Sequence, residues 1–192
     1  MKILVTDSIS EEGLQPLYAH AQVDIETKLD PKQMKALIGD YDALIVRSKT
    51  KVTADVIESG GKLKVVGRAG VGVDNIDIDA ATRKGVVVVN APTSNTISAA
   101  EHTIALMLAL ARNVPQANSL LKSGKWEKDK LVGTELRNKT LGIIGTGNVG
   151  SEVAKRAQAF EMRVIAHDPF VSADYAHHLK IHLVPLDQLF EE

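Results

Sequence analysis

Three glycines, Gly145, Gly147 and Gly150, separate a short apolar run from a helical pattern, and the strand pattern that follows ends at Asp168. Each glycine has a mechanical reason in a strand-turn-helix unit. Gly145 permits the tight turn, Gly147 lets the backbone approach a pyrophosphate, and Gly150 lets the helix lie against the strand. Asp168 stands at about the separation expected for an acid that binds ribose hydroxyls. This order predicts a dinucleotide-binding unit with the pyrophosphate at the helix N-terminus, rather than a merely structural turn.

The residues around and after Asp168 bear on the cofactor and on the extent of the fold. Pro169 and Phe170 follow the acid, and no basic residue stands nearby to receive a 2'-phosphate, so the sequence favours NAD over NADP. The competing interpretation is an aspartate in a proline-containing turn. The remaining residues allow a short helix (173–179), a strand (181–184) and a last helix (186–191). A complete dinucleotide fold has two such halves, so we expect only the half that holds the adenosine.

Composition excludes several classes of function. The formal net charge of -1 offers no basic excess for nucleic acid or a membrane surface, so neither partner is expected. The longest apolar stretch (103–111) is too short to span a bilayer. The chain has no cysteine, which rules out disulfides, thiolate metal sites and cysteine nucleophiles, and a cytoplasmic location fits.

Apolar runs alternate with helical patterns from the N-terminus, which is typical of α/β architecture with a parallel sheet. Strands are predicted at 3–6, 23–26, 43–46, 64–66 and 86–89, with helices beginning near Ser10, Pro31, Thr53 and Asp77. Gly39, Gly60 and Gly85 stand where helix ends favour a left-handed residue.

A polar run that contains Pro92 breaks this pattern, and we place a domain boundary there, between 1–95 and 96–192. Ser98 and Glu101 have the spacing of a capping box, which predicts the start of a long helix. That helix is apolar nearly all round from Ala99 to Leu110, which predicts burial between two domains or two subunits. An irregular connection with a second helix near 115–122 leads to the glycine-rich unit.

Three stretches (46–50, 66–77 and 90–102) together resemble the NAD-dependent D-2-hydroxyacid dehydrogenases, and 124–127 and 145–150 continue the match in the same order. The resemblance covers essentially the whole chain, as the N-terminal portion of such an enzyme. It implies a flavodoxin-like parallel-sheet substrate-binding domain in 1–95. It also implies that 96–192 forms the first half only of a Rossmann-type dinucleotide-binding domain.

The resemblance also implies substrate-binding residues. In the family, backbone amides near Val71 and Gly72 face the substrate carboxylate, and successive amides next to glycines do form anion-binding concavities. Arg47 and Arg68 match positions that hold substrate, with Arg47 the phosphate partner, since a guanidinium suits phosphate or carboxylate. The alternatives are glycines that only relieve strain and arginines that are solvated or salt-bridged.

For the cofactor, the resemblance implies that the amides of Asn148 and Val149 face the pyrophosphate and that Asp168 binds the ribose. Family members move the hydroxyl proton with a histidine paired with a carboxylate, and orient the substrate with an arginine. This sequence has no counterpart, so we expect no catalytic residue in it and no turnover by the 192 residues alone. We expect His102 to pack in the long helix or to contact a dimer partner, and His177, His178 and His182 to be exposed rather than to bind metal.

The implied reaction is oxidation of 3-phosphoglycerate to 3-phosphohydroxypyruvate with NAD, in serine synthesis, by a homodimer. Two alternatives stay open. One is another 2-hydroxyacid dehydrogenase of the glyoxylate or lactate type, for which a cation at Arg47 has no obvious use. The other is a non-catalytic NAD-binding fragment.

Overall fold

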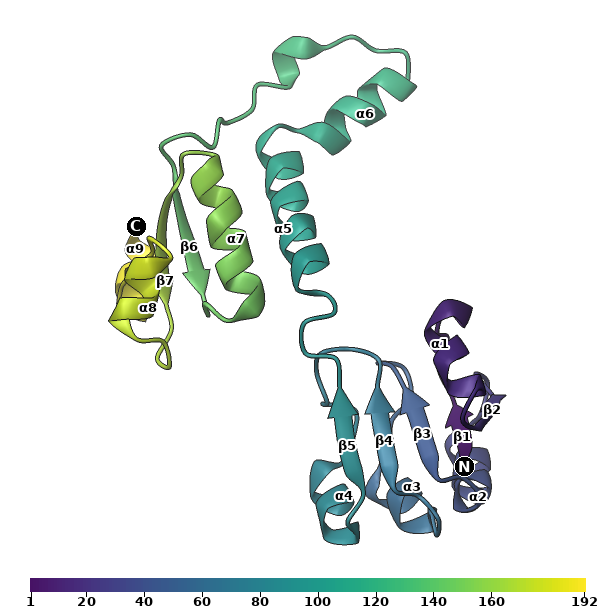
Figure 1. Cartoon of the computed structure of the whole chain (residues 1–192). Coiled ribbons are helices and arrows are strands. Elements are labelled where there is room, and N and C mark those ends of the chain that lie inside the picture. The colour runs from purple at the N-terminus through teal and green to yellow at the C-terminus, as the bar shows by residue number, and fades with distance from the viewer. The chain divides into compact units, whose positions relative to one another are not determined.

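Two sets of parallel strands, each with its own helices, make up the computed structural model, which describes residues 1–192 (Figure 1). The chain divides into the units Met1–Ser94 and Asn95–Glu192. The division falls one residue from the boundary placed near Pro92. The α/β fold class is therefore confirmed, and each unit is described separately below.

The first unit contains a five-stranded parallel sheet. Its strands are β1 (Lys2–Val5), β2 (Gln22–Ile25), β3 (Ala43–Val46), β4 (Val65–Arg68) and β5 (Val87–Asn90). Their order is β2-β1-β3-β4-β5, which is the flavodoxin-like order. Leu4 pairs with Leu44, which pairs in turn with Val66. All five predicted strands are present, with bounds shifted by at most two residues.

Helices cover both faces of this sheet. They are α1 (Glu11–Tyr18), α2 (Pro31–Leu37), the 3-10 helix η1 (Ile38–Asp40), α3 (Ala54–Ser59) and α4 (Ile78–Lys84). Alternate strand residues point to opposite faces. Leu4 therefore packs in the core formed with α2, α3 and α4, whereas Ile3 and Val5 pack with Leu14 of α1.

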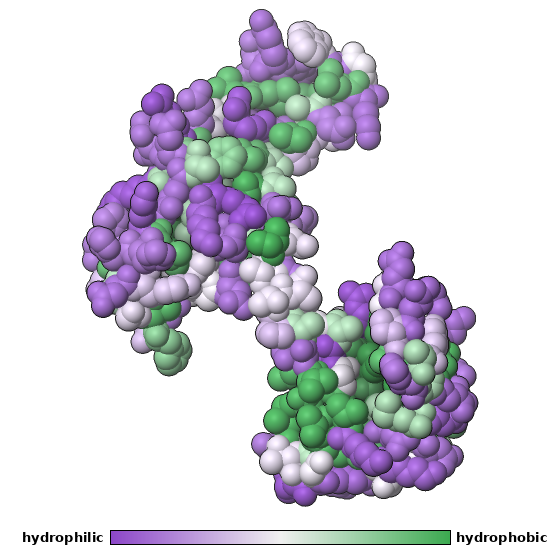
Figure 2. All heavy atoms as spheres, in the orientation of Figure 1, coloured by the Kyte–Doolittle hydropathy of each residue, from purple (hydrophilic) through white to green (hydrophobic).

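The α1 face of the sheet is only partly covered. Val87 and Val89 of β5 lie 58% and 49% exposed. Figure 2 shows the apolar side chains that gather over this end of the sheet.

The second unit contains a three-stranded parallel sheet in the order β6-β7-β8. Its strands are β6 (Thr140–Ile144), β7 (Arg163–His167) and β8 (His182–Leu183). Its helices are α5 (Thr96–Ala111), α6 (Val114–Lys122), the 3-10 helix η2 (Lys128–Lys130), α7 (Asn148–Ala159), α8 (Ala173–His178) and α9 (Leu186–Glu191). Ala100 and Ile104 of α5 pack in one core with Ala154 of α7.

Helix α5 begins earlier than the capping box predicts. Its N-cap is Asn95, and no side chain caps it. The prediction of a Ser98–Glu101 capping box is wrong because Glu101 lies beyond the first turn, where the helix's own carbonyls receive the amides. Glu101 instead lies 3.7 Å from the Nη2 atom of Arg156.

Within this chain, α5 buries only part of its surface, and the burial between two subunits that the sequence also allows stays a prediction. Ala100 and Ile104 are buried, whereas Leu110 is 78% exposed and His102 is exposed. His102 therefore does not pack within this chain, and its role as a dimer contact stays a prediction. No helix has the length and apolar character needed to cross a membrane.

Of the three glycines predicted to end helices in a left-handed conformation, only Gly85 does so, with φ +72°. Gly60 has φ -75° and Gly39 has no positive φ, so both predictions are wrong. A Cβ on Gly60 would lie 2.7 Å from the Cβ of Leu63. Gly60 is the C-cap of α3 without a left-handed conformation, and its close packing against Leu63 explains the glycine at this position.

Candidate functional site

Two of the three motif glycines are required by the fold itself. Gly145 follows β6 with φ +87°, and its amide donates to the carbonyl of His167 at 2.9 Å. A Cβ on Gly150 would overlap the carbonyl oxygen of Gly145. The turn and the close approach of α7 to β6 thus explain both residues.

Gly147 is different because the fold does not need it. Its φ is -66°, and a Cβ there would meet no atom within 4 Å. A side chain would instead project into the open space in front of the loop, next to the first turn of α7. No side chain caps this helix N-terminus. The arrangement fits an anion that approaches the backbone closely.

Asp168 follows β7 and is tied to the same loop. Its Oδ2 accepts from the amide and the hydroxyl of Thr146 at 2.7 and 3.0 Å, and its Oδ1 accepts from the amide of Phe170 at 3.0 Å. The Phe170 amide and then the Thr146 amide hold the pKa of this carboxyl below its usual value. Asp168 is therefore an ionised acceptor beside the glycine loop, and Oδ1 has room for a further donor.

A recess of about 530 Å³ borders this loop. It runs along β6, which is the edge strand and pairs only with β7. It continues past Gly145 and Gly147 to Asn148 and Val149. The structure thus brings together the predicted residues 145, 147, 148, 149 and 150, with Asp168 bonded to the loop from β7.

In the first unit, the carboxyl edge of the sheet carries the predicted substrate residues. Arg47 directly follows β3, and its Nη1 donates to the carbonyl of Ser8 at 3.2 Å. β1 and β3 are neighbours although their connections leave in opposite directions. Ligands of open α/β sheets bind at such a switch point. Arg47 is exposed there, so its guanidinium can reach a ligand.

Arg68, the last residue of β4, is placed differently. Its side chain is 10% exposed, and its nearest carboxylate is Asp74, at 3.6 Å. Positions for a Cβ on Gly70 and Gly72 lie 3.1 and 3.4 Å from its Nη1, so the loop fits closely over the guanidinium. Its Nε has no partner. A buried, incompletely satisfied cation under a glycine loop favours an anion at that loop.

The loop itself presents free donors. The amide of Gly70 donates to the carbonyl of Arg68 at 2.8 Å, but the amides of Val71 and Gly72 donate to no group of the chain. Asn90 holds the loop by donating to the carbonyl of Val71. Two neighbouring free amides can receive a carboxylate.

Comparison with known proteins places these features in a family. The model of the D-isomer specific 2-hydroxyacid dehydrogenase catalytic domain matches residues 3–178. The chain belongs to this family. It is 51% identical over 191 residues to a D-3-phosphoglycerate dehydrogenase of Synechocystis sp. and 53% identical over 190 residues to one of Archaeoglobus fulgidus. The alignments cover 100% and 98% of this chain but 34% and 36% of the relatives, so the chain spans about a third of their length.

Solved structures give the same result for the fold. A protein from Thermus thermophilus matches with a TM-score of 0.91 at 31% identity, over 100% of this chain and 62% of the other. A D-lactate dehydrogenase from Aquifex aeolicus, complexed with NAD and lactic acid, matches with a TM-score of 0.87 at 26% identity, over 100% of this chain and 58% of the other. The α/β dehydrogenase fold is thus shown for the whole chain.

The structure adds residues that sequence reasoning missed. A recess of about 380 Å³ at the carboxyl edge of the first sheet is lined in part by Lys28, Lys49 and Lys51, none of which has an ion-pair partner. Asp7, after β1, and Asn75 hold the Arg47 segment. The stretch 46–50 that carries the family resemblance already contained Lys49, whereas nothing local marked Lys28.

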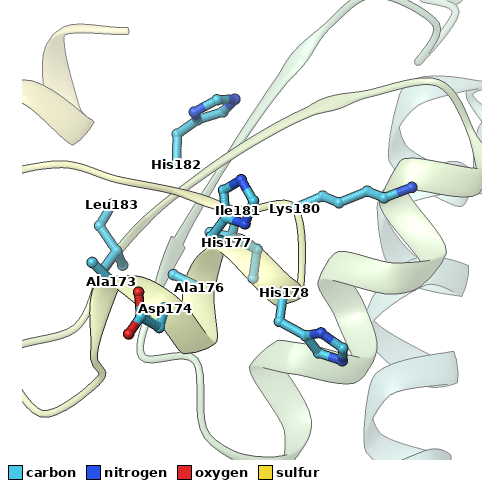
Figure 3. A pocket seen from close by; sticks show the side chains of 9 residues that line it. All are labelled: Ala173, Asp174, Ala176, His177, His178, Lys180, Ile181, His182 and Leu183. Carbon is cyan, nitrogen blue, oxygen red and sulfur yellow. The ribbon is translucent and has the colours of Figure 1, made fainter.

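A further recess, of about 930 Å³, lies between α8 and β8, away from the glycine loop and Asp168 (Figure 3). His177, His178 and His182 line it and are exposed. Figure 3 shows His178 directed away from the other two imidazoles. No three His, Asp or Glu side chains of the chain are grouped as metal ligands.

Proposed function

We propose that this chain forms the substrate-binding part and the adenosine-binding part of a dehydrogenase that oxidises 3-phosphoglycerate to 3-phosphohydroxypyruvate with NAD, in serine synthesis. In this proposal Met1–Ser94 binds substrate and Asn95–Glu192 binds the cofactor. Two relatives that are 51% and 53% identical to this chain are named D-3-phosphoglycerate dehydrogenase, which supports the assignment.

The observation that carries the proposal is the pairing of two kinds of anion receptor at one sheet edge. The free amides of Val71 and Gly72 suit a carboxylate. The guanidinium of Arg47, together with the ammonium groups of Lys28, Lys49 and Lys51, suits a phosphate. A substrate with one carboxylate and one phosphate uses both. A lactate or glyoxylate substrate leaves the cations without a partner, which disfavours that alternative.

The cofactor proposal rests on Gly147 and Asp168. The open space before Gly147 fits a pyrophosphate, and the ionised Asp168 fits a ribose hydroxyl. A 2'-phosphate would place like charge beside Asp168, so we propose NAD rather than NADP. Asn148 and Val149 would contribute amides to the pyrophosphate, as the first residues of α7.

NAD, when bound, supplies the acceptor for a hydride. The residues of this chain bind and orient: the Val71–Gly72 amides and Arg68 hold the carboxylate end, Arg47 holds the phosphate end, and the glycine loop fixes the adenosine half. Of the six histidines, only His167 touches either site, through its backbone carbonyl, which accepts from the amide of Gly145, while its Nδ1 lies 3.1 Å from the carbonyl of Val184. We therefore expect the 192-residue polypeptide alone to produce no NADH from 3-phosphoglycerate.

Self-association and location are further parts of the proposal. Leu106, Leu110, Trp126 and Val132 of the segment 96–132 are exposed, and exposed apolar surface of this kind favours a homodimer. Sedimentation at tens of micromolar, an order-of-magnitude range for weak association, tests this. A cytoplasmic location stays a prediction.

Calorimetric titration tests the substrate class directly. The chain is titrated with 3-phosphoglycerate, D-glycerate, D-lactate and glyoxylate. We expect 3-phosphoglycerate to bind most tightly, by about tenfold over D-glycerate, since only it engages the cations. Equal affinity for 3-phosphoglycerate and D-glycerate would contradict the phosphate assignment, and tighter binding of lactate or glyoxylate would favour the alternative.

A further inference from the structure

The segment Arg47–Thr50 is held by a buried acid. Asp7 is 4% exposed at the end of β1. Its Oδ2 accepts from the amides of Arg47 and Thr50 at 2.6 and 3.2 Å, and its Oδ1 accepts from the Thr50 hydroxyl at 2.9 Å. A buried carboxylate is costly unless it is hydrogen-bonded, and all of its described bonds go to this one segment.

The opposite side of the same segment is held by Asn75. Its Nδ2 donates to the carbonyls of Arg47 and Thr50 at 2.7 and 2.6 Å. Its Oδ1 is buried without a partner. The side chain thus leaves its own Oδ1 without a hydrogen bond while its Nδ2 binds both carbonyls. This indicates that its main role is to hold the Arg47–Thr50 segment.

Asn75 also belongs to the loop that carries Val71 and Gly72. The amide of Val52 donates to the carbonyl of Asn75 at 2.8 Å, and the amide of Asp77 donates to the carbonyl of Val52 at 2.9 Å. Earlier in both segments, the amide of Ala69 donates to the carbonyl of Val46 at 2.8 Å. The two loops are thus joined at both ends by backbone bonds and in the middle by one side chain.

We infer that Asp7 and Asn75 are positioning residues that fix the distance between the phosphate receptor at Arg47 and the carboxylate receptor at Val71–Gly72. Asp7 holds the amide side of the Arg47 segment and Asn75 the carbonyl side. This inference rests on the proposed function. Its consequence is selectivity by spacing: the site distinguishes 3-phosphoglycerate from 2-phosphoglycerate, whose phosphate lies one carbon closer to the carboxylate.

The test measures affinity of the 192-residue chain for both phosphoglycerates in the wild type and in Asp7→Asn and Asn75→Ala. We expect the wild type to prefer 3-phosphoglycerate by at least about tenfold, and each variant to narrow that ratio by about threefold or more. Thr6→Val is the matched control, because the Thr6 hydroxyl is buried beside Asp7 and has no partner. A fall in affinity for both ligands with an unchanged ratio would mean a merely structural role and would overturn the inference.

A double-mutant cycle adds a second criterion. In an Arg47→Ala background, Asp7→Asn should cause a smaller further loss of 3-phosphoglycerate affinity than in the wild type, because Asp7 acts through the segment that carries Arg47 and Lys49. A full additive loss would contradict this. If Asp7→Asn does not fold, Thr50→Val replaces it, since that change removes only the hydroxyl bond to Asp7.

Amide hydrogen exchange separates this inference from the proposed function. Exchange at the Arg47 and Thr50 amides should accelerate in Asp7→Asn, and exchange at Val52 should accelerate in Asn75→Ala, with no change in Thr6→Val. Unchanged exchange would overturn the inference whatever the ligand. If the wild type binds neither phosphoglycerate while exchange responds as expected, the proposed function fails and the positioning of the segment stands.

Discussion

The proposed nucleotide site, at residues 145–150 with Asp168, and the proposed substrate site, at the carboxyl edge of the first sheet, draw on very different lengths of chain. The nucleotide loop takes its turn, its helix start and its acid from residues 145–168, within one strand-helix-strand unit. The substrate edge collects Asp7, Lys28, Arg47 and Arg68 from the ends of four different strands. A motif made by one local unit is visible in the sequence, whereas a site assembled by a sheet becomes visible only when the strand order is known.

The two regions also differ in why their glycines are needed. Gly145 and Gly150 serve the fold, and Gly147 faces open space. At the proposed substrate site, Gly70 and Gly72 lie against the guanidinium of Arg68. The absence of side chains there lets the loop pack closely over this buried cation.

Gly150→Ala should disrupt the second unit, whereas Gly147→Ala should leave it folded. The new Cβ at position 150 meets the Gly145 carbonyl, and overpacking typically costs about 1 to 3 kcal/mol. The free energy of unfolding by urea, followed by circular dichroism and Trp126 fluorescence, measures both. Gly147→Ala should instead weaken NAD binding, measured by calorimetry. Equal unfolding midpoints for the two variants would contradict the distinction between fold glycine and ligand glycine.

Arg47→Ala should lower affinity for 3-phosphoglycerate by about tenfold to a hundredfold, since charge-assisted hydrogen bonds contribute about 1.5–3 kcal/mol. Affinity for NAD should not change, because the cofactor residues belong to the other unit. Calorimetry with each ligand separately gives both numbers. Arg83→Ala, an exposed arginine in the last turn of α4, is the control. A comparable loss with the control variant would indicate a general charge effect and not a phosphate site.

The strands and the glycine turn could be predicted from the sequence, because each depends on residues that are close together along the chain. The strand before Arg47 is predicted with its observed bounds, and the strand predicted to end at Asp168 ends one residue earlier, at His167. The start of α5 at Thr96 could not be derived because no side chain caps it, and the exposure of His102 could not because it depends on which face of α5 packs against α7. Asp7 and Asn75 were missed because their partners lie 25 to 43 residues away along the chain.

Asp168→Ala should narrow the preference for NAD over NADP, which we expect to be about tenfold in the wild type. In the proposed site the carboxylate would accept from a ribose hydroxyl and repel a 2'-phosphate, so its removal should weaken the binding of NAD and strengthen that of NADP. Calorimetry with both cofactors measures the ratio. Asp174→Ala, an exposed acid in the first turn of α8, is the control. Equal affinities for NAD and NADP in the wild type would refute the ribose assignment.

Each unit contains a carboxylate whose lowered pKa should make the stability of the fold depend on pH in the acid range. In the first unit, the hydroxyl of Tyr41 and then Lys2 hold the pKa of Asp24 below its usual value of 3.8. In the second, the amides of Phe170 and Thr146 do the same for Asp168.

Because both pKa values are lowered in the folded state, the ionised groups stabilise the fold above the unfolded pKa, and this contribution is lost as the pH falls through the folded values. Asp24→Asn and Asp168→Asn should therefore flatten the decline of the urea midpoint between about pH 5 and pH 2. Asp40→Asn, which removes an exposed acid 3.6 Å from Lys62, is the control and should follow the wild type. An unchanged decline in both test variants would show that these two carboxylates do not govern acid unfolding, in either unit.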